Sequence, residues 1–325
     1  MSNRTRENFV IYDDQFYGGM TEVLQQEANA FNGASANTIQ VADAASLGDF
    51  NTESFFKALA SGSLARRRDI TTNGAGTINT LSQDEHVSVK VNRYNITDIK
   101  LDQLKKQGKD SGEFSFILGE QFAKQLMLDY LNNGIAAASA AVGQDNEQNN
   151  DTGTMTTAGL VQALSVMGDQ ADRIGAFVMH SKAYYDLVQQ QIASNIYDIS
   201  SVNIKEGTPI TLGRPVIVTD SPSLISAGTG PGAVDEYYTL ALAEGAIRVE
   251  ESEERTVYSE IVTGNENLVL RLQNEWAFNL GLKGYKYDIA NGGVNPTDAA
   301  IATASNWDKI ASDDKDLLGV RLVTQ

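Results

Sequence analysis

Hydrophobic residues recur with two different periods along this chain, and each period predicts a different element. From position 113 onward they return every four residues, at Phe114, Leu118, Phe122, Leu126 and Tyr130. That spacing places the side chains on one face of a helix, and the alanine-rich stretch GIAAASAAVG continues it. The sequence therefore predicts one long helix. It ends in QDNEQNND (144–151), a polar run typical of a surface loop.

A period of two is found in HVSVKV. Val87, Val89 and Val91 alternate there with Ser88 and Lys90, as in a strand with one buried face. The preceding NGAG is typical of a turn. Because ITTNGAGTINT contains few hydrophobic residues, we expect a long hairpin that projects from the body of the protein.

The pattern before the hairpin is weaker. Residues 1–51 are rich in Asn, Gln, Ala and Gly and hold only a short helical signal, MTEVLQQEANAF (20–31), so we expect an N-terminal arm. A compact helix is predicted in TESFFKALASG, where Thr52 can cap the first turn. Its hydrophobic face would consist of Phe55, Phe56 and Leu59.

The second half of the chain mixes helices and strands. A helix is predicted over about 157–171, with Leu160, Val161, Leu164 and Met167 on its hydrophobic face. RIGAFVMHSKAYYDLVQ (173–189) indicates a buried strand that runs into a helix, and VIV (216–218) indicates a short strand in a proline-rich segment. Four later segments alternate hydrophobic and polar residues and predict a half-buried antiparallel sheet: YYTLALA, GAIRVE, TVYSEIVT and NLVLRLQNEWAFNLGLKGYKYD. The fold class is therefore α+β.

Composition excludes several kinds of site. The 325 residues include no cysteine, which rules out disulfides, thiolate metal ligands and a cysteine nucleophile, and only two histidines. There are 25 basic and 42 acidic residues, and the resulting charge of −17 repels nucleic acid at long range. No segment has the ~18 apolar residues of a membrane span or the pattern of a secretory signal. We expect a cytosolic protein when it is made, with no membrane contact.

Each candidate for chemistry has a simpler structural interpretation. Ser181 follows a strand and precedes a helix, so it is predicted to cap that helix, and its neighbours lack the glycines of a hydrolase elbow. His180 has no second histidine near it in the sequence. EESEE (250–254) could bind a divalent cation, but such runs are more often solvated. GTGPG (228–232) lacks the residues of a phosphate loop, and QDNEQNND has Asn150 where a calcium loop requires Gly. We therefore predict no catalytic, cofactor-binding or metal-binding residue.

One basic triplet stands out in this acidic chain. Arg66, Arg67 and Arg68 are consecutive and lie beside the predicted hairpin. They could contact nucleic acid, but carboxylates of a neighbouring acidic subunit are the preferred partner, because each guanidinium can donate two hydrogen bonds to one carboxylate. We predict that the three arginines form a subunit interface.

The order of these parts resembles the major capsid proteins of tailed phages, which have the Hong Kong 97-like coat fold. The resemblance covers nearly the whole chain. FFKALASGSLARRRDIT and LSQDEHVSVKVNR resemble the hairpin region, RIGAFVMHSKAYYDLVQQQI resembles the strand and helix of the peripheral domain, and TLGRPVIVTDSP with YYTLALAEGAIRVE resembles the axial-domain strands. The implied boundaries are an arm at 1–51, a short helix and extended loop at 52–110, the spine helix and first part of the peripheral domain at 111–195, the axial domain at about 196–245, and the rest of the peripheral domain with the C-terminal segment at 246–325.

This resemblance implies a structural, non-enzymatic protein of the virion. Its copies would form pentamers and hexamers of an icosahedral shell around double-stranded DNA, with the arm and the hairpin lapping over neighbouring subunits. Expected partners are a portal protein, a separate scaffolding protein and a decoration protein, with assembly in the host cytoplasm and no amino-terminal cleavage. Some relatives crosslink a Lys to an Asn, and Lys90 and Lys100 lie in a suitable region, but no partner is identified.

Two alternatives stay open. The first is the shell of a cellular nanocompartment, which has the same fold but encloses cargo protein. The second is an enzyme with a site around His180 and Ser181.

Overall fold

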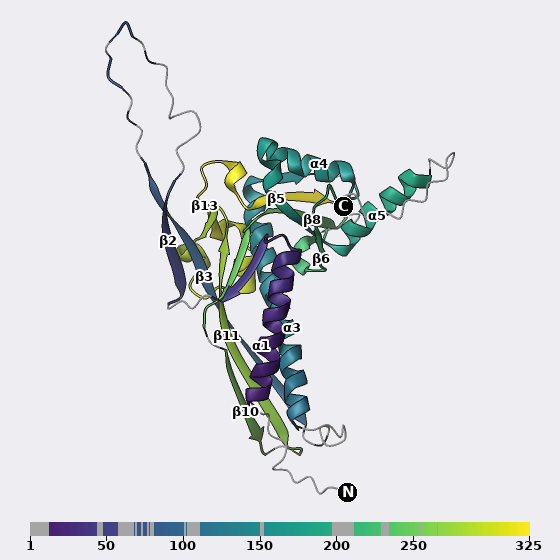
Figure 1. The fold of residues 1–325 in the computed structure, drawn as a ribbon. Coiled ribbons are helices and arrows are strands. Elements are labelled where there is room, and N and C mark those ends of the chain that lie inside the picture. Colours follow the sequence, from purple (N-terminus) through teal and green to yellow (C-terminus); the bar gives the residue numbers. More distant parts are fainter. Residues whose placement is uncertain are drawn as a thin grey trace.

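The structure is a computed structural model of the chain. It describes residues 13–43, 48–57, 68, 70–72, 74–76, 78, 81–100, 102, 111–149, 153–196, 211–228, 234–253, 255–264 and 266–325. Two helices run along the length of the molecule against one sheet, and a second sheet with further helices lies at one end (Figure 1).

The predicted long helix is confirmed. Helix α3 spans Ser111–Asp145, and Phe122, Leu126 and Tyr130 are buried on the face that the four-residue spacing indicated. Fully buried alanines in its second half, Ala137, Ala138 and Ala141, allow close packing against the rest of the core.

Helix α1 (Asp13–Ala34) packs along α3, as Figure 1 shows. It begins well before the short helical signal at 20–31, and it belongs to the folded body. Phe16, Met20 and Leu24 are buried in the main core. These three residues share the four-residue spacing, which was overlooked because the polar residues between them dominate the composition.

The first sheet has the strand order β1-β9-β11-β3-β2, and β10 also pairs with β11. Its strands are β1 (Ile39–Asp43), β2 (Phe50–Phe56), β3 (Gln83–Lys100), β9 (Ile247–Glu251), β10 (Thr256–Val262) and β11 (Val269–Leu282). All pairs are antiparallel except β1 with β9. The alternation predicted for β11 is confirmed, because Leu270, Leu272, Phe278, Leu280 and Leu282 are all buried.

The compact helix predicted in TESFFKALASG is wrong where the structure describes it. Residues 50–56 form strand β2, paired with β3 from Phe50↔Val89 to Phe56↔Gln83, and Leu59 lies outside the described residues. Phe and Thr favour strands, and the backbone of β3 offers an edge on which β2 completes its hydrogen bonds. Long-range pairing therefore overrides a short helical spacing.

The predicted hairpin is present, with different strand limits. β2 and β3 are its two strands, and the Lys57 backbone N–H donates to the Ser82 carbonyl (2.9 Å), so the connecting segment is 57–82. Val89 and Val91 are buried as predicted, and Val87 is half-buried. β3 then continues past the hairpin and pairs with β11 as far as Lys100.

The second sheet has the order β4-β14-β8-β5-β6, with β7 on β8. The strands are β4 (Glu147–Asn149), β5 (Ile174–Met179), β6 (Val216–Val218), β7 (Ile225–Ser226), β8 (Glu236–Ala243) and β14 (Gly319–Thr324). Two expectations are corrected here. The strand YYTLALA (β8) is not part of the same sheet as the three segments that follow it, and the polar run at 144–151 includes strand β4, which pairs with β14.

Helices cover this second sheet. α4 (Thr157–Val166) buries Leu160 and Leu164, while Val161 is half exposed. It is shorter than predicted because Gly168, at φ +56°, ends it before the 3-10 helix Gly168–Arg173. α5 (Ser181–Ile196) follows β5 directly, as predicted.

The C-terminal part completes the main core. Strands β12 (Tyr285–Tyr287) and β13 (Trp307–Lys309) form a small hairpin-like sheet with short helices α6 (Ile289–Gly292) and α7 (Asp298–Ile301) between them. The second sheet joins segments on both sides of the predicted axial boundary. The division into arm, loop, peripheral and axial domains stays a prediction.

Candidate subunit-interface surfaces

The junction between β5 and α5 is a helix cap. His180 accepts the Tyr184 N–H on its carbonyl oxygen (3.1 Å), and its Nδ1 accepts the Lys182 N–H (3.1 Å). Ser181 is the first residue of the helix, so the prediction that its side chain is the cap is wrong. The imidazole performs that function, although sequence preferences for Ser at such junctions pointed to its neighbour.

Ser181, His180 and Asp220 lie together, but their hydrogen bonds do not form a catalytic triad. His180 Nε2 is 3.3 Å from Asp220 Oδ1, which also accepts the Ser181 N–H (3.3 Å). Hydrogen bonds from Ser181 lower the pKa of Asp220. A neutral imidazole has one lone pair, and here the helix N–H occupies it, so the ring has no acceptor left to activate a serine. The group anchors the start of α5 to the end of β6.

The acidic run EESEE is engaged in ion pairs. Glu250 pairs with Arg248 (3.2 Å), Glu251 pairs with Arg255, and Glu253 accepts from buried Lys90 (2.5 Å). Glu254 lies outside the described residues. Within the described part of the chain, no group of three or more His, Asp or Glu side chains could hold a metal ion.

The segment that connects β2 and β3, residues 57–82, is called the hairpin extension, and its described hydrophobic side chains are exposed to solvent. Ile70 and Ile78 are each 85% exposed and Leu81 is 54% exposed. Arg68 is also exposed, whereas Arg66 and Arg67 lie outside the described residues. Single exposed hydrophobic residues are common, but two isoleucines and a leucine exposed on one segment are typical of a surface that another molecule covers.

The first sheet has a second exposed surface, on the face opposite α1 and α3. Tyr258 of β10 and Ile96 of β3 flank Gln273 of β11 in one row, and they are 66% and 49% exposed. In a neighbouring row Arg271 donates two hydrogen bonds to Asp98 (2.8 and 2.9 Å). These bonds lower the pKa of Asp98. The face therefore combines apolar patches with fixed charges.

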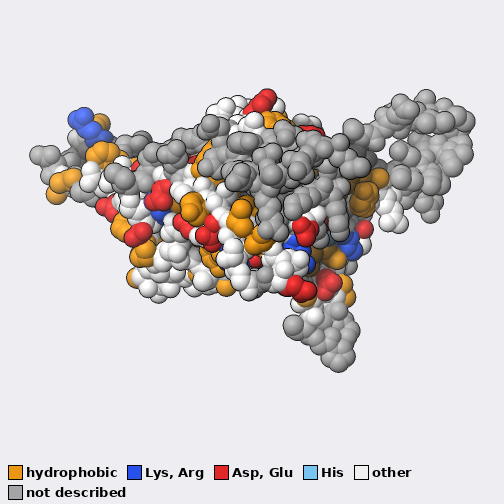
Figure 2. Space-filling view, turned by 90° about the horizontal axis from the view of Figure 1, so that it is seen from below, with side chains coloured by type: hydrophobic (Ala, Val, Ile, Leu, Met, Phe, Trp, Pro, Cys, Tyr) orange, Lys and Arg blue, Asp and Glu red, His pale blue; other side chains and the backbone are white. Residues whose placement is uncertain are grey.

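On the face drawn in Figure 2, the described side chains form no large basic area. Figure 2, which views the molecule from below, shows acidic side chains interspersed with hydrophobic ones on that face, while basic side chains are fewer. This agrees with the charge of −17. It offers no broad surface for gripping nucleic-acid phosphates on the part that is drawn.

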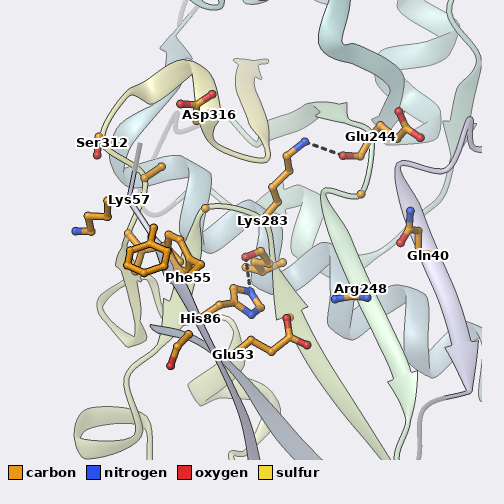
Figure 3. A pocket seen from close by; sticks show the side chains of 18 residues that line it. Gln40, Glu53, Phe55, Lys57, His86, Glu244, Arg248, Lys283, Ser312 and Asp316 are labelled. Atoms are coloured by element: carbon orange, nitrogen blue, oxygen red, sulfur yellow. Dashed lines mark hydrogen bonds between the residues drawn. The ribbon is translucent and has the colours of Figure 1, made fainter. Parts of the chain in front are cut away.

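A hollow of about 670 Å³ lies at the root of the hairpin (Figure 3). Phe55, Phe56, Leu282 and Ile310 contribute its hydrophobic lining, and its charged side chains include Lys57, Arg248 and Lys283. Lys283 Nζ donates to the Glu244 carbonyl (2.9 Å), and burial lowers its pKa. Glu53, Glu244 and Asp316 line the hollow as well, so acidic side chains balance the basic ones.

The family of the chain follows from its whole length. The sequence matches the model of a family described as Gp13-like, major capsid protein 13-like, over residues 8–321. The chain belongs to this major capsid protein family. It is a structural subunit of a phage capsid shell and is located in the virion. Among curated proteins none matches it.

Solved phage capsids share the fold. A chain of the cyanophage Pam1 capsid asymmetric unit is 11% identical, with a TM-score of 0.54 and 88% of each chain covered. A chain from the capsid structure of Helicobacter pylori bacteriophage KHP30 is 10% identical, with a TM-score of 0.51 and coverage of 90% and 89%. A chain from Mycobacterium phage Bobi is 13% identical, with a TM-score of 0.51 and 90% of each chain covered. The predicted Hong Kong 97-like fold is confirmed.

At the junction of β5 and α5, the described residues His180, Ser181 and Asp220 form a helix cap and not a catalytic cluster. None of its described helices is long and apolar enough to cross a membrane. The exposed sheet face and the hollow were not predicted, because each is built from strands that are distant in sequence.

Proposed function

We propose that copies of this capsid protein form pentamers and hexamers that close an icosahedral shell around double-stranded DNA. The family match over residues 8–321 carries this proposal. A portal protein, a scaffolding protein and a decoration protein are its further proposed partners. The DNA is confined without tight binding, because a subunit of charge −17 repels it.

We also propose that the hairpin extension, residues 57–82, is a contact between subunits. Its isoleucines are exposed in the single chain, and residues 66–68 supply the only basic triplet of an acidic protein. A neighbouring copy offers what both need, namely hydrophobic surface such as Tyr258 and Ile96, and carboxylates. Because a closed shell repeats this contact in every subunit, a small free energy per contact is sufficient.

The proposed role involves no catalysis. The support for this is the cap geometry, in which the His180 lone pair accepts the Lys182 N–H. A nanocompartment shell would have the same fold. It encloses cargo protein, whereas a phage head encloses DNA, so the contents of the particle distinguish the two.

The test is electron microscopy of the chain expressed alone and together with its genomic neighbours, followed by analysis of the particle contents. We expect closed shells that package DNA when the neighbours are present. Closed shells that enclose only protein, with no portal, would support the nanocompartment instead. A chain that stays monomeric in all combinations would refute both shells.

A further inference from the structure

A second cavity, of about 440 Å³, lies between helix α1 and the β1 edge of the first sheet. We call it the α1 cavity. Leu24 and Ala28 of α1 and Val41 of β1 give it apolar walls, and Tyr130 of α3 also lines it. Pockets for small molecules have volumes of about 300–1,000 Å³, whereas one ordered water needs only about 10–15 Å³. The α1 cavity is therefore large enough for a small organic molecule.

Hydrogen bonds hold the two walls of the α1 cavity together at both ends of α1. Near the end of the helix, the Asn32 side chain donates to the Val41 carbonyl and accepts the Val41 N–H, both at 3.0 Å. Near its start, the Tyr17 hydroxyl donates to the Arg255 carbonyl (2.9 Å) and accepts the Val257 N–H (3.0 Å). The space between α1 and the sheet is thus preformed, as in most small-molecule sites.

Two buried donors line the α1 cavity. Tyr130 is only 1% exposed, and its hydroxyl has no hydrogen-bond partner among the described residues. The same holds for Nε of Arg255, whose side chain is 10% exposed. Both residues line the cavity. Because buried donors in native proteins are nearly always satisfied, this pair points to an acceptor atom within the cavity.

The charges around these donors favour an uncharged acceptor. Arg255 donates through Nη2 to Glu251, which also lines the cavity, so the guanidinium charge is already balanced. Burial raises the pKa of Tyr130, so its hydroxyl stays protonated and can donate. A further carboxylate or amine would bring an unbalanced charge into this partly buried place. The rim on α1 is uncharged as well, with Thr21, Gln25 and Asn29 exposed.

We propose that the α1 cavity binds an uncharged small molecule through a carbonyl oxygen that accepts from the Tyr130 hydroxyl and from Arg255 Nε. The apolar body of this molecule lies against Leu24, Ala28 and Val41. Because the site exists only in the folded chain, its ligand stabilises the subunit. The site lies within one copy, so this inference does not depend on the proposed shell.

The test compares three probes of nearly equal shape, namely benzamide, benzoate and benzamidinium. Each is titrated into the unassembled full-length subunit by isothermal calorimetry, and urea unfolding is followed with and without it. We expect saturable binding of benzamide at one site, about tenfold or more tighter than that of either charged probe, and a higher urea midpoint. Equal affinity for all three, or no saturable binding of benzamide, would overturn the inference.

Two phenylalanine variants locate the binding site. Tyr130→Phe should weaken benzamide binding by about three- to tenfold and leave the stability of the free subunit unchanged, because its hydroxyl has no partner to lose. Tyr285→Phe is the matched control. Its hydroxyl donates to Asp145 (3.0 Å) outside the cavity, so this change should destabilise the subunit and leave the affinity for benzamide unchanged.

The other outcomes are equally informative. If Tyr130→Phe destabilises the free subunit, the hydroxyl bonds within the protein and the inference is wrong. If Tyr130→Phe binds benzamide as tightly as the wild type, the probe binds elsewhere. Ala28→Met gives an independent check, because a flexible side chain and good helix former would fill the cavity. It should abolish benzamide binding, and undiminished binding would again refute the site.

Discussion

Replacing Gly119 by alanine should destabilise the subunit, although alanine stabilises most helices. Gly119 lies in α3 where α1 crosses it, and an added Cβ would be under 3.0 Å from the Phe16 carbonyl oxygen and 3.2 Å from the Met20 nitrogen. The contact is reciprocal, since a Cβ at Gly19 would be 2.8 Å from the Phe116 carbonyl oxygen. The two glycines allow the backbones of α1 and α3 to touch.

The magnitude follows from two opposing effects. Gly→Ala in a helix interior usually gains about 0.5–1 kcal/mol, because the unfolded chain loses freedom. Here the new methyl group meets backbone atoms, so α1 must shift and disturb Phe16 and Met20, which are fully buried. Overpacking of this kind costs about 1–3 kcal/mol. We expect a net loss of about 0.5–2 kcal/mol in the free energy of unfolding.

Urea unfolding of the unassembled subunit, followed by circular dichroism, measures this change as a lower midpoint at constant slope. Gly18→Ala is the matched control. Gly18 lies in α1 next to Gly19, and an added Cβ there has nothing within 4 Å. It should stabilise the subunit by about 0.5–1 kcal/mol. If both variants stabilise the subunit equally, α1 does not pack against α3 at this position.

Four other variants and conditions give separate tests. Changing residues 66–68 to alanine should leave the melting of the subunit unchanged and reduce particle yield in sedimentation; normal yield would remove their proposed contact, and a lower melting temperature would assign them to the fold. Arg271→Gln should raise the pKa of Asp98 in 13C NMR. Because the folded-state pKa of Asp98 is lowered, its ion pair stabilises the subunit at neutral pH, and this stabilisation fades as pH falls through the lowered pKa. The free energy of unfolding should therefore depend less on pH in the variant than in the wild type. An equal dependence in both would contradict the pairing. His180→Ala should cost about 1 kcal/mol and Ser181→Ala much less, and the reverse order would restore serine as the cap. The purified subunit should bind duplex DNA more weakly than about micromolar at physiological salt, and tighter binding would contradict the electrostatic argument.

Elements with a long, regular period were predictable from the sequence. Helix α3 and strand β11 have repeats that extend over many residues, and their buried faces match those repeats. The strand-to-helix junction at β5 and α5 was also visible, because a hydrophobic run changes there to a helical spacing. The order of these parts was sufficient to suggest the capsid fold.

Elements that depend on distant partners were not predictable. Phe55 and Phe56 fit a helical face equally well, and only the edge of β3 decides that they lie in a strand. The cap role of His180 depends on a side-chain orientation that composition does not determine. Gly119 has no signal in a single sequence, because its function is to make room for Phe16, which is far away along the chain. The exposed sheet face and the hollow were missed for the same reason, because strands that are distant in sequence build them.

The central claim is that this chain is the shell subunit, and cryo-electron microscopy of particles purified from cells that express it with its genomic neighbours tests that claim most directly. The account predicts closed icosahedral shells whose repeating density fits α3, the two sheets and a hairpin that extends from β2 and β3 to an adjacent copy. Shells whose repeating density is another protein, with this chain absent from the wall, would contradict it.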